Sequence, residues 1–319
     1  MTVTLTPGRW RGLKMSSTAQ DVFTILAFDQ RGSYRKMLPE GSSYDDAVRI
    51  KQEVVVALTQ VTSAVLLDNF YGLSSALHMR GGAGLLMAVE ESGYSGDATY
   101  RKLIFDDNWT VAKIKHMGGS AVKLLAYYHP HSGALAEEIE GVIASVIDEC
   151  HRHDLPLFLE PMSYSLDANI KKESAAFAES RPEVVRETAR RLGALGPDVL
   201  KLEFPYDAAF HTDRDAWRAG CDAISEVSSV PWVLLSAGVD FEVFADQTRI
   251  ACAAGASGWL AGRAIWKECV TMSADERAAF LAGTATRRAQ TLAEIAAAGA
   301  RPWTQFYAPP AASSEWFVG

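Results

Sequence analysis

Hydrophobic residues along the chain gather in eight short runs that are apolar at nearly every position. Such a run predicts a strand buried on both faces, because a strand with one wet face would alternate apolar and polar residues. The runs span residues 24–29, 63–68, 84–90, 121–128, 156–164, 199–205, 232–238 and 258–263.

Segments with the apolar spacing of helices lie between these runs, and several end in glycine, a common helix stop. They include residues 45–61, 108–119, 135–153, 182–195 and 241–256, and a final helical segment covers 273–300. The gap between the second and third runs is short, so we expect a tight connection there. Eight strand–helix units without a flexible linker predict an α/β fold, a single-domain (β/α)₈ TIM barrel. We place the barrel at residues 21–300, between an N-terminal extension (1–20) and a C-terminal tail (301–319).

Composition and charge narrow the possible partners. The chain has 319 residues, 48% of them hydrophobic, which is ample for a large core. Its net charge of -8 argues against a nucleic acid or an anionic membrane as partner, although a local cluster of cations can still bind a small anion. No stretch approaches the roughly 18 apolar residues of a membrane span, and the start has no apolar leader core. We therefore expect a cytoplasmic protein.

Metal and cofactor motifs are weak. The four cysteines lack CxxC spacing, which argues against a disulfide framework or a zinc site. Two HxH pairs occur, at 129–131 and 151–153, but Pro130 interrupts the first and the second lies at a helix end, where cations favour the dipole. The glycines at 81–84 lack the spacing of a dinucleotide-binding loop. We expect neither a metal nor a cofactor.

Polar residues concentrate at the carboxyl ends of the predicted strands. This is the face of a (β/α)₈ barrel that carries function, whereas the opposite face serves stability. Each residue alone has a structural explanation, so the hypothesis depends on their meeting at one mouth. They are Asp29, Gln30, Arg31, Asp68, Lys123, Glu160, Lys201, Glu203, Ser236, Gly238, Gly262 and Arg263.

Two lysines and a glutamate at this mouth suggest Schiff-base chemistry. A lysine is a nucleophile only as the neutral amine, and burial or a second cation lowers the pKa of such an amine. Lys123 and Lys201 lie two strands apart, so both can reach the axial cavity, and Glu160 is the candidate acid and base. Strand alternation predicts that Glu203 shares the inward face of Lys201 and pairs with nearby cations. The competing interpretation is a structural ion pair of Glu203 with Lys201 or Lys123.

The last two strands predict a phosphate site, because the loops after strands seven and eight often bind phosphate in these barrels. "LLSAGVD" offers the Ser236 hydroxyl and backbone amides up to Gly238. "LAGRAIW" offers amides at Gly262 and the guanidinium of Arg263. Alternatively, both glycines only permit tight turns.

Seven segments together resemble the class I tagatose-1,6-bisphosphate aldolases, and the related sulfofructose-phosphate aldolases are also similar. They are "ILAFDQRGSYRKML", "AVLLDNFYGL", "GLLMAVEESGY", "AVKLLAYYHP", "PLFLEPMSY", "DVLKLEFP" and "VLLSAGVDFEVF…LAGRAIW", between about residues 20 and 270. The resemblance implies that Lys201 forms the Schiff base and that Glu160 is the acid/base. It also implies that Lys123, Asp29 and Gln30 line the substrate site, and that Ser236, Gly262 and Arg263 bind phosphate. The implied reaction is reversible cleavage of a ketose phosphate into dihydroxyacetone phosphate and an aldehyde, without a cofactor.

Several alternatives stay open at this point. The chain has Asn69 and Phe70 where the tagatose enzymes have a proline and an acid, so the distal group of the sugar could be a phosphate, a sulfonate or absent. A metal-dependent lyase or isomerase and a non-catalytic regulator that binds a sugar phosphate are the other classes. We expect a homo-oligomer, and a tail that is either loose or anchored by Trp303, Phe306 and Trp316 on the barrel or on a neighbouring subunit.

Overall fold

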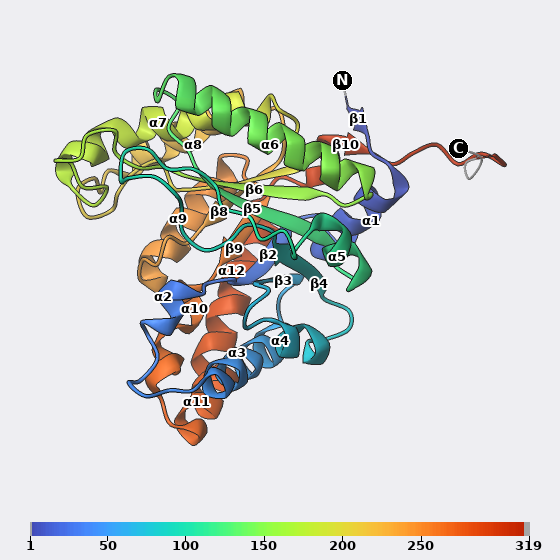
Figure 1. Cartoon of the computed structure of the whole chain (residues 1–319), viewed down its shortest axis with the longest axis vertical. Helices are drawn as coiled ribbons and strands as arrows, with labels where there is room; N and C mark the ends of the chain where they lie inside the picture. Colours follow the sequence, from blue (N-terminus) through green and yellow to red (C-terminus); the bar gives the residue numbers. More distant parts are fainter. Residues whose placement is uncertain (1, 316–319) are drawn as a thin grey trace.

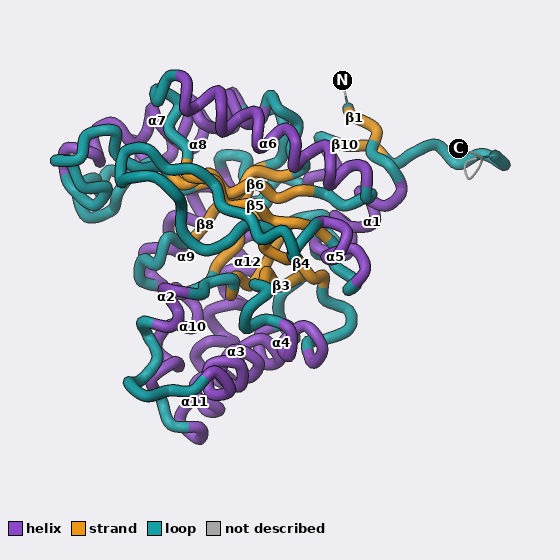
Figure 2. Tube along the Cα trace, viewed as in Figure 1, coloured by secondary structure: helices purple, strands orange, loops and turns teal. Residues whose placement is uncertain are grey.

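The eight apolar runs form the eight strands of a closed parallel barrel in the computed structural model, which describes residues 2–315 (Figures 1 and 2). The barrel strands are β2 (Phe23–Phe28), β3 (Ala64–Leu67), β4 (Gly84–Ala88), β5 (Ala121–Tyr127), β6 (Leu157–Met162), β7 (Val199–Leu202), β8 (Trp232–Leu235) and β9 (Gly258–Ala261). Each strand pairs with the next along the chain, and β9 closes the barrel on β2. The predicted single-domain TIM barrel is confirmed.

Helices surround the barrel, and all the predicted helical segments are present. They are α1 (Pro7–Ser16), α2 (Gly32–Arg35), α3 (Tyr44–Leu58), α4 (Leu73–His78), α5 (Val111–His116), α6 (Ala134–Arg152), α7 (Ala175–Gly193), α8 (Arg214–Val227), α9 (Phe241–Ala253), α10 (Arg263–Trp266), α11 (Ala274–Phe280) and α12 (Thr286–Gly299). Two short 3₁₀ turns (Lys267–Thr271 and Trp303–Gln305) and one π turn (Leu281–Ala285) complete the helical elements. The short gap after β3 holds only α4, as expected.

The strands end earlier than their apolar runs. β7 stops at Leu202, three residues before the end of its run, and the run itself finishes at Pro205, which has no N–H for a ladder. β8 stops at Leu235 because Ala237 and Gly238 take left-handed conformations, with φ of 47° and 83°. Because these strands end early, the residues that follow them can line a pocket at the carboxyl end of the barrel.

The core has an inner and an outer layer. Phe23, Leu66, Leu86, Phe158 and their neighbours fill the barrel interior, while a larger cluster packs the strands against the helices. The outer face of each strand is therefore as apolar as its inner face, which explains the continuous runs in the sequence.

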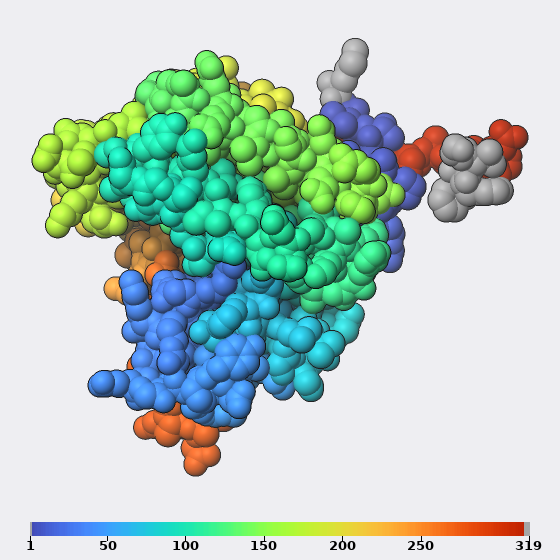
Figure 3. Space-filling model, viewed as in Figure 1, coloured from blue at the N-terminus to red at the C-terminus, as the bar shows by residue number. Residues whose placement is uncertain are grey.

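α1 and residues 303–308 cover the amino-terminal end of the barrel. Leu13 of α1 is fully buried in the inner cluster, and Trp10 meets Trp303 edge to face with ring centroids 4.7 Å apart. The two-residue strands β1 (Val3–Thr4) and β10 (Tyr307–Ala308) pair with each other, so the blue and red segments lie side by side (Figure 3). Trp303 thus anchors the tail on the same chain and Phe306 packs against this cluster, whereas Trp316 lies outside the described residues.

A buried carboxylate links several elements at the amino-terminal end of the barrel. Asp198, which precedes β7, accepts hydrogen bonds from Arg9 at 2.8 and 3.0 Å and lies 3.1 Å from Nε2 of His151. The Tyr307 hydroxyl donates to the Asp198 carbonyl oxygen. The second HxH motif therefore contributes to stability at the face opposite the mouth.

Candidate active site

A pocket of about 250 Å³ opens at the carboxyl ends of the barrel strands. Residues from nearly every strand end meet there, although they are far apart in the sequence. The predicted residues that line it are Asp29, Gln30, Arg31, Lys123, Glu160, Lys201, Ser236, Gly262 and Arg263.

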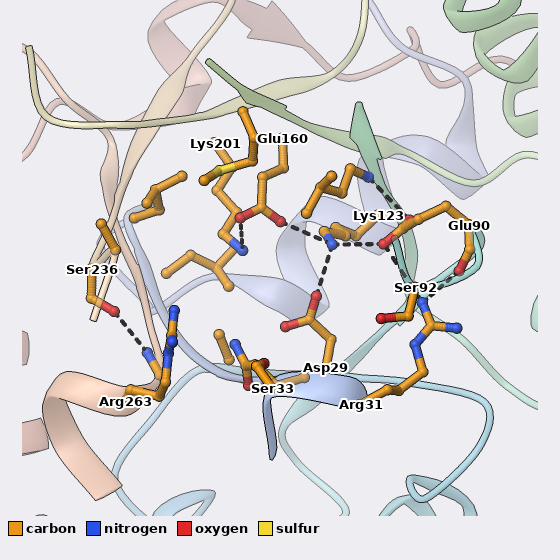
Figure 4. A pocket seen from close by; sticks show the side chains of 18 of the residues that line it. Asp29, Arg31, Ser33, Glu90, Ser92, Lys123, Glu160, Lys201, Ser236 and Arg263 are labelled. Atoms are coloured by element: carbon orange, nitrogen blue, oxygen red, sulfur yellow. Dashed lines mark hydrogen bonds and ion pairs between the residues drawn. The ribbon is translucent and has the colours of Figure 1, made fainter. Parts of the chain in front are cut away.

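Lys123 lies at the centre of a ring of three carboxylates (Figure 4). Its ammonium is 2.7 Å from Asp29, 2.8 Å from Glu90 and 2.9 Å from Glu160, and the side chain is fully buried. Burial alone would lower the pKa of Lys123, but the three negative charges outweigh burial and raise it well above its ordinary value. Lys123 is therefore a permanent cation, and it occupies the point where these carboxylates converge.

The pKa values of two neighbouring carboxylates, Asp29 and Glu90, shift in opposite directions. Burial would raise the pKa of Asp29, but the charges of Lys123 and Lys201 lower it below its ordinary value. Burial raises the pKa of Glu90, and Lys123 only partly opposes this. Asp29 is thus firmly ionised, while Glu90 binds a proton more readily.

Among residues 2–315, Lys201 makes a single close ionic contact, with Glu160. The Lys201 Nζ lies 2.7 Å from Oε1 of Glu160, whose other oxygen faces Lys123. Strand parity explains this, because Lys201 and Lys123 both point inward from β7 and β5, and Glu160 points inward from β6 between them. A carboxylate that touches both amines can move protons to and from the group at Lys201.

One end of the pocket carries a guanidinium and a hydroxyl group. Ser236, Ala237, Gly262 and Arg263 line it, and the Gly262 N–H donates to the Ser236 hydroxyl at 3.3 Å. Gly238 does not line the pocket, but a Cβ at this position would lie 3.2 Å from the guanidinium carbon of Arg263. Gly238 is therefore needed both for its left-handed φ and for the close approach of Arg263.

The opposite end of the pocket also carries a cation. Figure 4 shows Arg31 and Ser92 on the other side of Lys123 from Lys201, with Ser236 and Arg263 beyond Lys201. Arg31 donates to the carbonyl oxygen of Glu90 at 2.6 Å and to the side chain of Asn69 at 3.2 Å. The lysines thus lie between two cationic ends.

Two residues predicted to bind substrate lie outside this pocket. Asp68 is fully buried behind it, paired with Lys51 of α3. Glu203 pairs with Lys172 at 2.6 Å, and no ion pair joins it to Lys201 or Lys123 in residues 2–315.

The Glu203 prediction was wrong because strand alternation ends at Leu202, so parity no longer sets the direction of the next acidic residue. Glu203 does pair with cations, as predicted, but these cations are Lys172 and Arg181 and not the two lysines of the pocket. Burial would raise the pKa of Glu203, but Lys172 and Arg181, with a hydrogen bond from Ser163, lower it to about 2.

Glu90 lines the pocket and contacts Lys123, and the sequence analysis did not single it out. It follows β4 at the same parity as the inward-facing Leu86 and Ala88, and the Val89 N–H still donates to the Lys123 carbonyl of β5, so the alternation continues as far as Glu90. Ser33 and Ser92 also line the pocket, but Ser33 lies in the four-residue helix α2 and Ser92 in a loop, and neither segment is long enough to show a periodicity that indicates direction.

Such a site on such a barrel defines a class of enzyme. A buried lysine in contact with a buried carboxylate, beside a pocket end that carries an arginine, is the arrangement of a class I aldolase, a lyase that works through a lysine Schiff base. The chain belongs to the DeoC/LacD aldolase family, whose model matches residues 23–268.

Relatives and solved structures agree with this assignment. The chain is 31% identical to the tagatose 1,6-diphosphate aldolase of Listeria monocytogenes, with 96% of each chain covered. It is 33% identical to tagatose 1,6-diphosphate aldolase 2 of Enterococcus faecalis, with 94% of this chain and 97% of the relative covered. A Schiff-base-forming fructose-1,6-bisphosphate aldolase shares the fold, with a TM-score of 0.61, 19% identity, and 89% of this chain and 98% of that one covered.

Two further observations concern partners. None of the helices in residues 2–315 is long and apolar enough to span a bilayer. In the same described part of the chain, no three His, Cys, Asp or Glu side chains form a set of possible metal ligands.

Proposed function

We propose that the protein cleaves a ketose 1,6-bisphosphate such as tagatose 1,6-bisphosphate into dihydroxyacetone phosphate and glyceraldehyde 3-phosphate. The observation that carries this proposal is the position of Lys201 and Glu160 between two cationic ends, Arg263 with Ser236 and Arg31 with Ser92. A substrate with one phosphate at each end of a six-carbon chain matches this arrangement. The names of the relatives favour the bisphosphate over a sulfonate.

In the proposed reaction, the Lys201 amine adds to the C2 ketone, and loss of water gives an iminium. A base removes the C4 hydroxyl proton, the C3–C4 bond breaks, and its electrons move to the iminium nitrogen to give an enamine and the aldehyde. Protonation of the enamine at C3 and addition of water then release dihydroxyacetone phosphate and the free lysine.

Glu160 is the proposed acid and base because it touches the amine of Lys201 directly. Lys123 holds Glu160 and Asp29 in place through its fixed positive charge. Asp29 Oδ1 is buried and has no hydrogen-bond partner among residues 2–315, so it is suited to accept a bond from a substrate hydroxyl.

We expect the purified protein to release dihydroxyacetone phosphate from tagatose or fructose 1,6-bisphosphate, and to act more slowly on the 1-phosphates. A coupled assay of dihydroxyacetone phosphate over a panel that includes 6-deoxy-6-sulfofructose 1-phosphate measures this. Faster turnover of the sulfonate than of either bisphosphate would transfer the assignment to sulfosugars. Binding without turnover of any member would favour a regulator.

The anion-binding role of Arg263 predicts a defined loss. Arg263→Met should lower kcat/KM for the bisphosphate by about 100-fold, because the guanidinium supplies charge-assisted hydrogen bonds that methionine cannot make. Arg287→Met is the control, because Arg287 is an exposed arginine on α12. If the two variants had equal kinetics, Arg263 would not be a phosphate-binding residue.

We also propose that the enzyme works in the cytoplasm as a homo-oligomer. Four buried free thiols suit a reducing compartment. An apolar surface patch around α3 and α4 suits a contact with a second subunit. Its large hydrophobic side chains are more than half exposed and belong to Tyr44, Phe70, Leu73 and Leu77.

A further inference from the structure

Lys51 is a buried lysine that lies outside the pocket and holds the backbone on both sides of Asp29. It is part of α3, and its side chain is fully buried. Its ammonium donates to the carbonyl oxygens of Phe28 at 2.7 Å and Gln30 at 3.2 Å, and also to Asp68. An ammonium has three N–H groups, so all of them are used and none remains for a ligand.

Stability alone does not account for this cation. The ammonium lies 4.5 Å from the centroid of the Phe28 ring and within 6 Å of the rings of Tyr34 and Tyr71. A buried ion pair is often no more stabilising than apolar side chains of the same volume. An apolar residue, however, could not hold two carbonyl oxygens just beyond the end of a strand.

The same ion pair also fixes the end of the next strand. The second carboxylate oxygen of Asp68 accepts hydrogen bonds from the backbone N–H groups of residues 70–71, at 2.9 and 2.7 Å. These bonds shape the turn that carries Asn69, whose side chain accepts a hydrogen bond from Arg31. Lys51 and Asp68 therefore support, from behind, the end of β2, which supplies Asp29 and Arg31, and the end of β3, which supplies Asn69.

We propose that Lys51 is a positioning residue of the aldolase reaction. Together with Asp68, it fixes the backbone at residues 28–31 so that the Asp29 carboxylate meets Lys123 and the substrate. This inference rests on the proposed function, and specifically on the role of Asp29 there.

The test is a double-mutant cycle. Lys51→Met should lower kcat/KM about 10- to 100-fold in the folded protein, as expected when the support of a catalytic group is lost. In an Asp29→Asn background, the same change should have almost no further effect, because Lys51 acts through Asp29. If Lys51→Met does not fold, the cycle uses Lys51→Met/Asp68→Asn, which removes both buried charges together.

Arg277→Met supplies the matched control. Arg277 is also a buried cation bonded to a carboxylate of α3, Glu53, but it reaches no strand end of the pocket. It should lower the unfolding temperature and leave kcat/KM unchanged. Additive effects of Lys51 and Asp29, or a folded Lys51 variant within twofold of wild type, would overturn the inference. An inactive wild type would instead overturn the proposed function.

Discussion

Lys201→Met should lower kcat at least about 1,000-fold while the protein stays folded. Methionine has a similar length and no amine, so the variant loses the covalent step, and only binding and the remaining polar groups still contribute. The measurement pairs steady-state kinetics with borohydride trapping in the presence of dihydroxyacetone phosphate. Peptide mapping of the wild type should find the reduced adduct on Lys201, and the variant should form none.

Lys172→Met is the control for this experiment. Lys172 also contacts a buried glutamate, at 2.6 Å, but it lies outside the pocket that holds Lys201. This variant should keep its adduct and most of its activity. An adduct on Lys123 would keep the enzyme class and exchange the roles of the two lysines, whereas the absence of any adduct would refute the Schiff base.

Glu160→Gln is the second change with a large expected effect. Glutamine keeps the size of the side chain and an acceptor oxygen, but it cannot take up or release a proton, so kcat should fall about 100- to 10,000-fold. Binding of dihydroxyacetone phosphate should survive, because the anion-binding end at Ser236 and Arg263 is untouched.

Glu203→Gln is the control that distinguishes a loss of catalysis in Glu160→Gln from a loss of folding stability. Glu203 is as buried as Glu160 and is also paired with a lysine, so both variants should lose stability. Only Glu160→Gln should lose turnover at a temperature where both are folded. Similar kinetics for the two variants would show that Glu160 is structural.

The barrel could be predicted because the sequence pattern follows directly from burial on both strand faces. The site could be predicted wherever a residue lies within a strand, since parity then sets its direction, as for Lys123, Glu160 and Lys201. Glu90 lies two residues beyond β4 but keeps this parity, because the Val89 N–H still donates to the Lys123 carbonyl of β5.

Prediction failed for two acidic residues that directly follow a strand end, Asp68 after β3 and Glu203 after β7. Glu203 turns toward Lys172 of the loop after β6, and Asp68 turns behind the mouth toward Lys51 of α3. Both partners are distant in sequence, and neither contact follows from local spacing. Ser33 and Ser92 were missed because one lies in the single-turn helix α2 and the other in a loop, and neither segment has a readable periodicity.

The closure of β9 on β2 has a consequence for synthesis of the chain. Phe23 pairs with Gly258, and Trp10 packs on Trp303, so residues 10–23 have no partners until residues 258–303 have left the ribosome. Until then one edge of β2 has unpaired backbone groups, which other strands can bind. We therefore expect newly made chains to need protection by chaperones until release, and truncated chains that end before β9 to aggregate rather than fold.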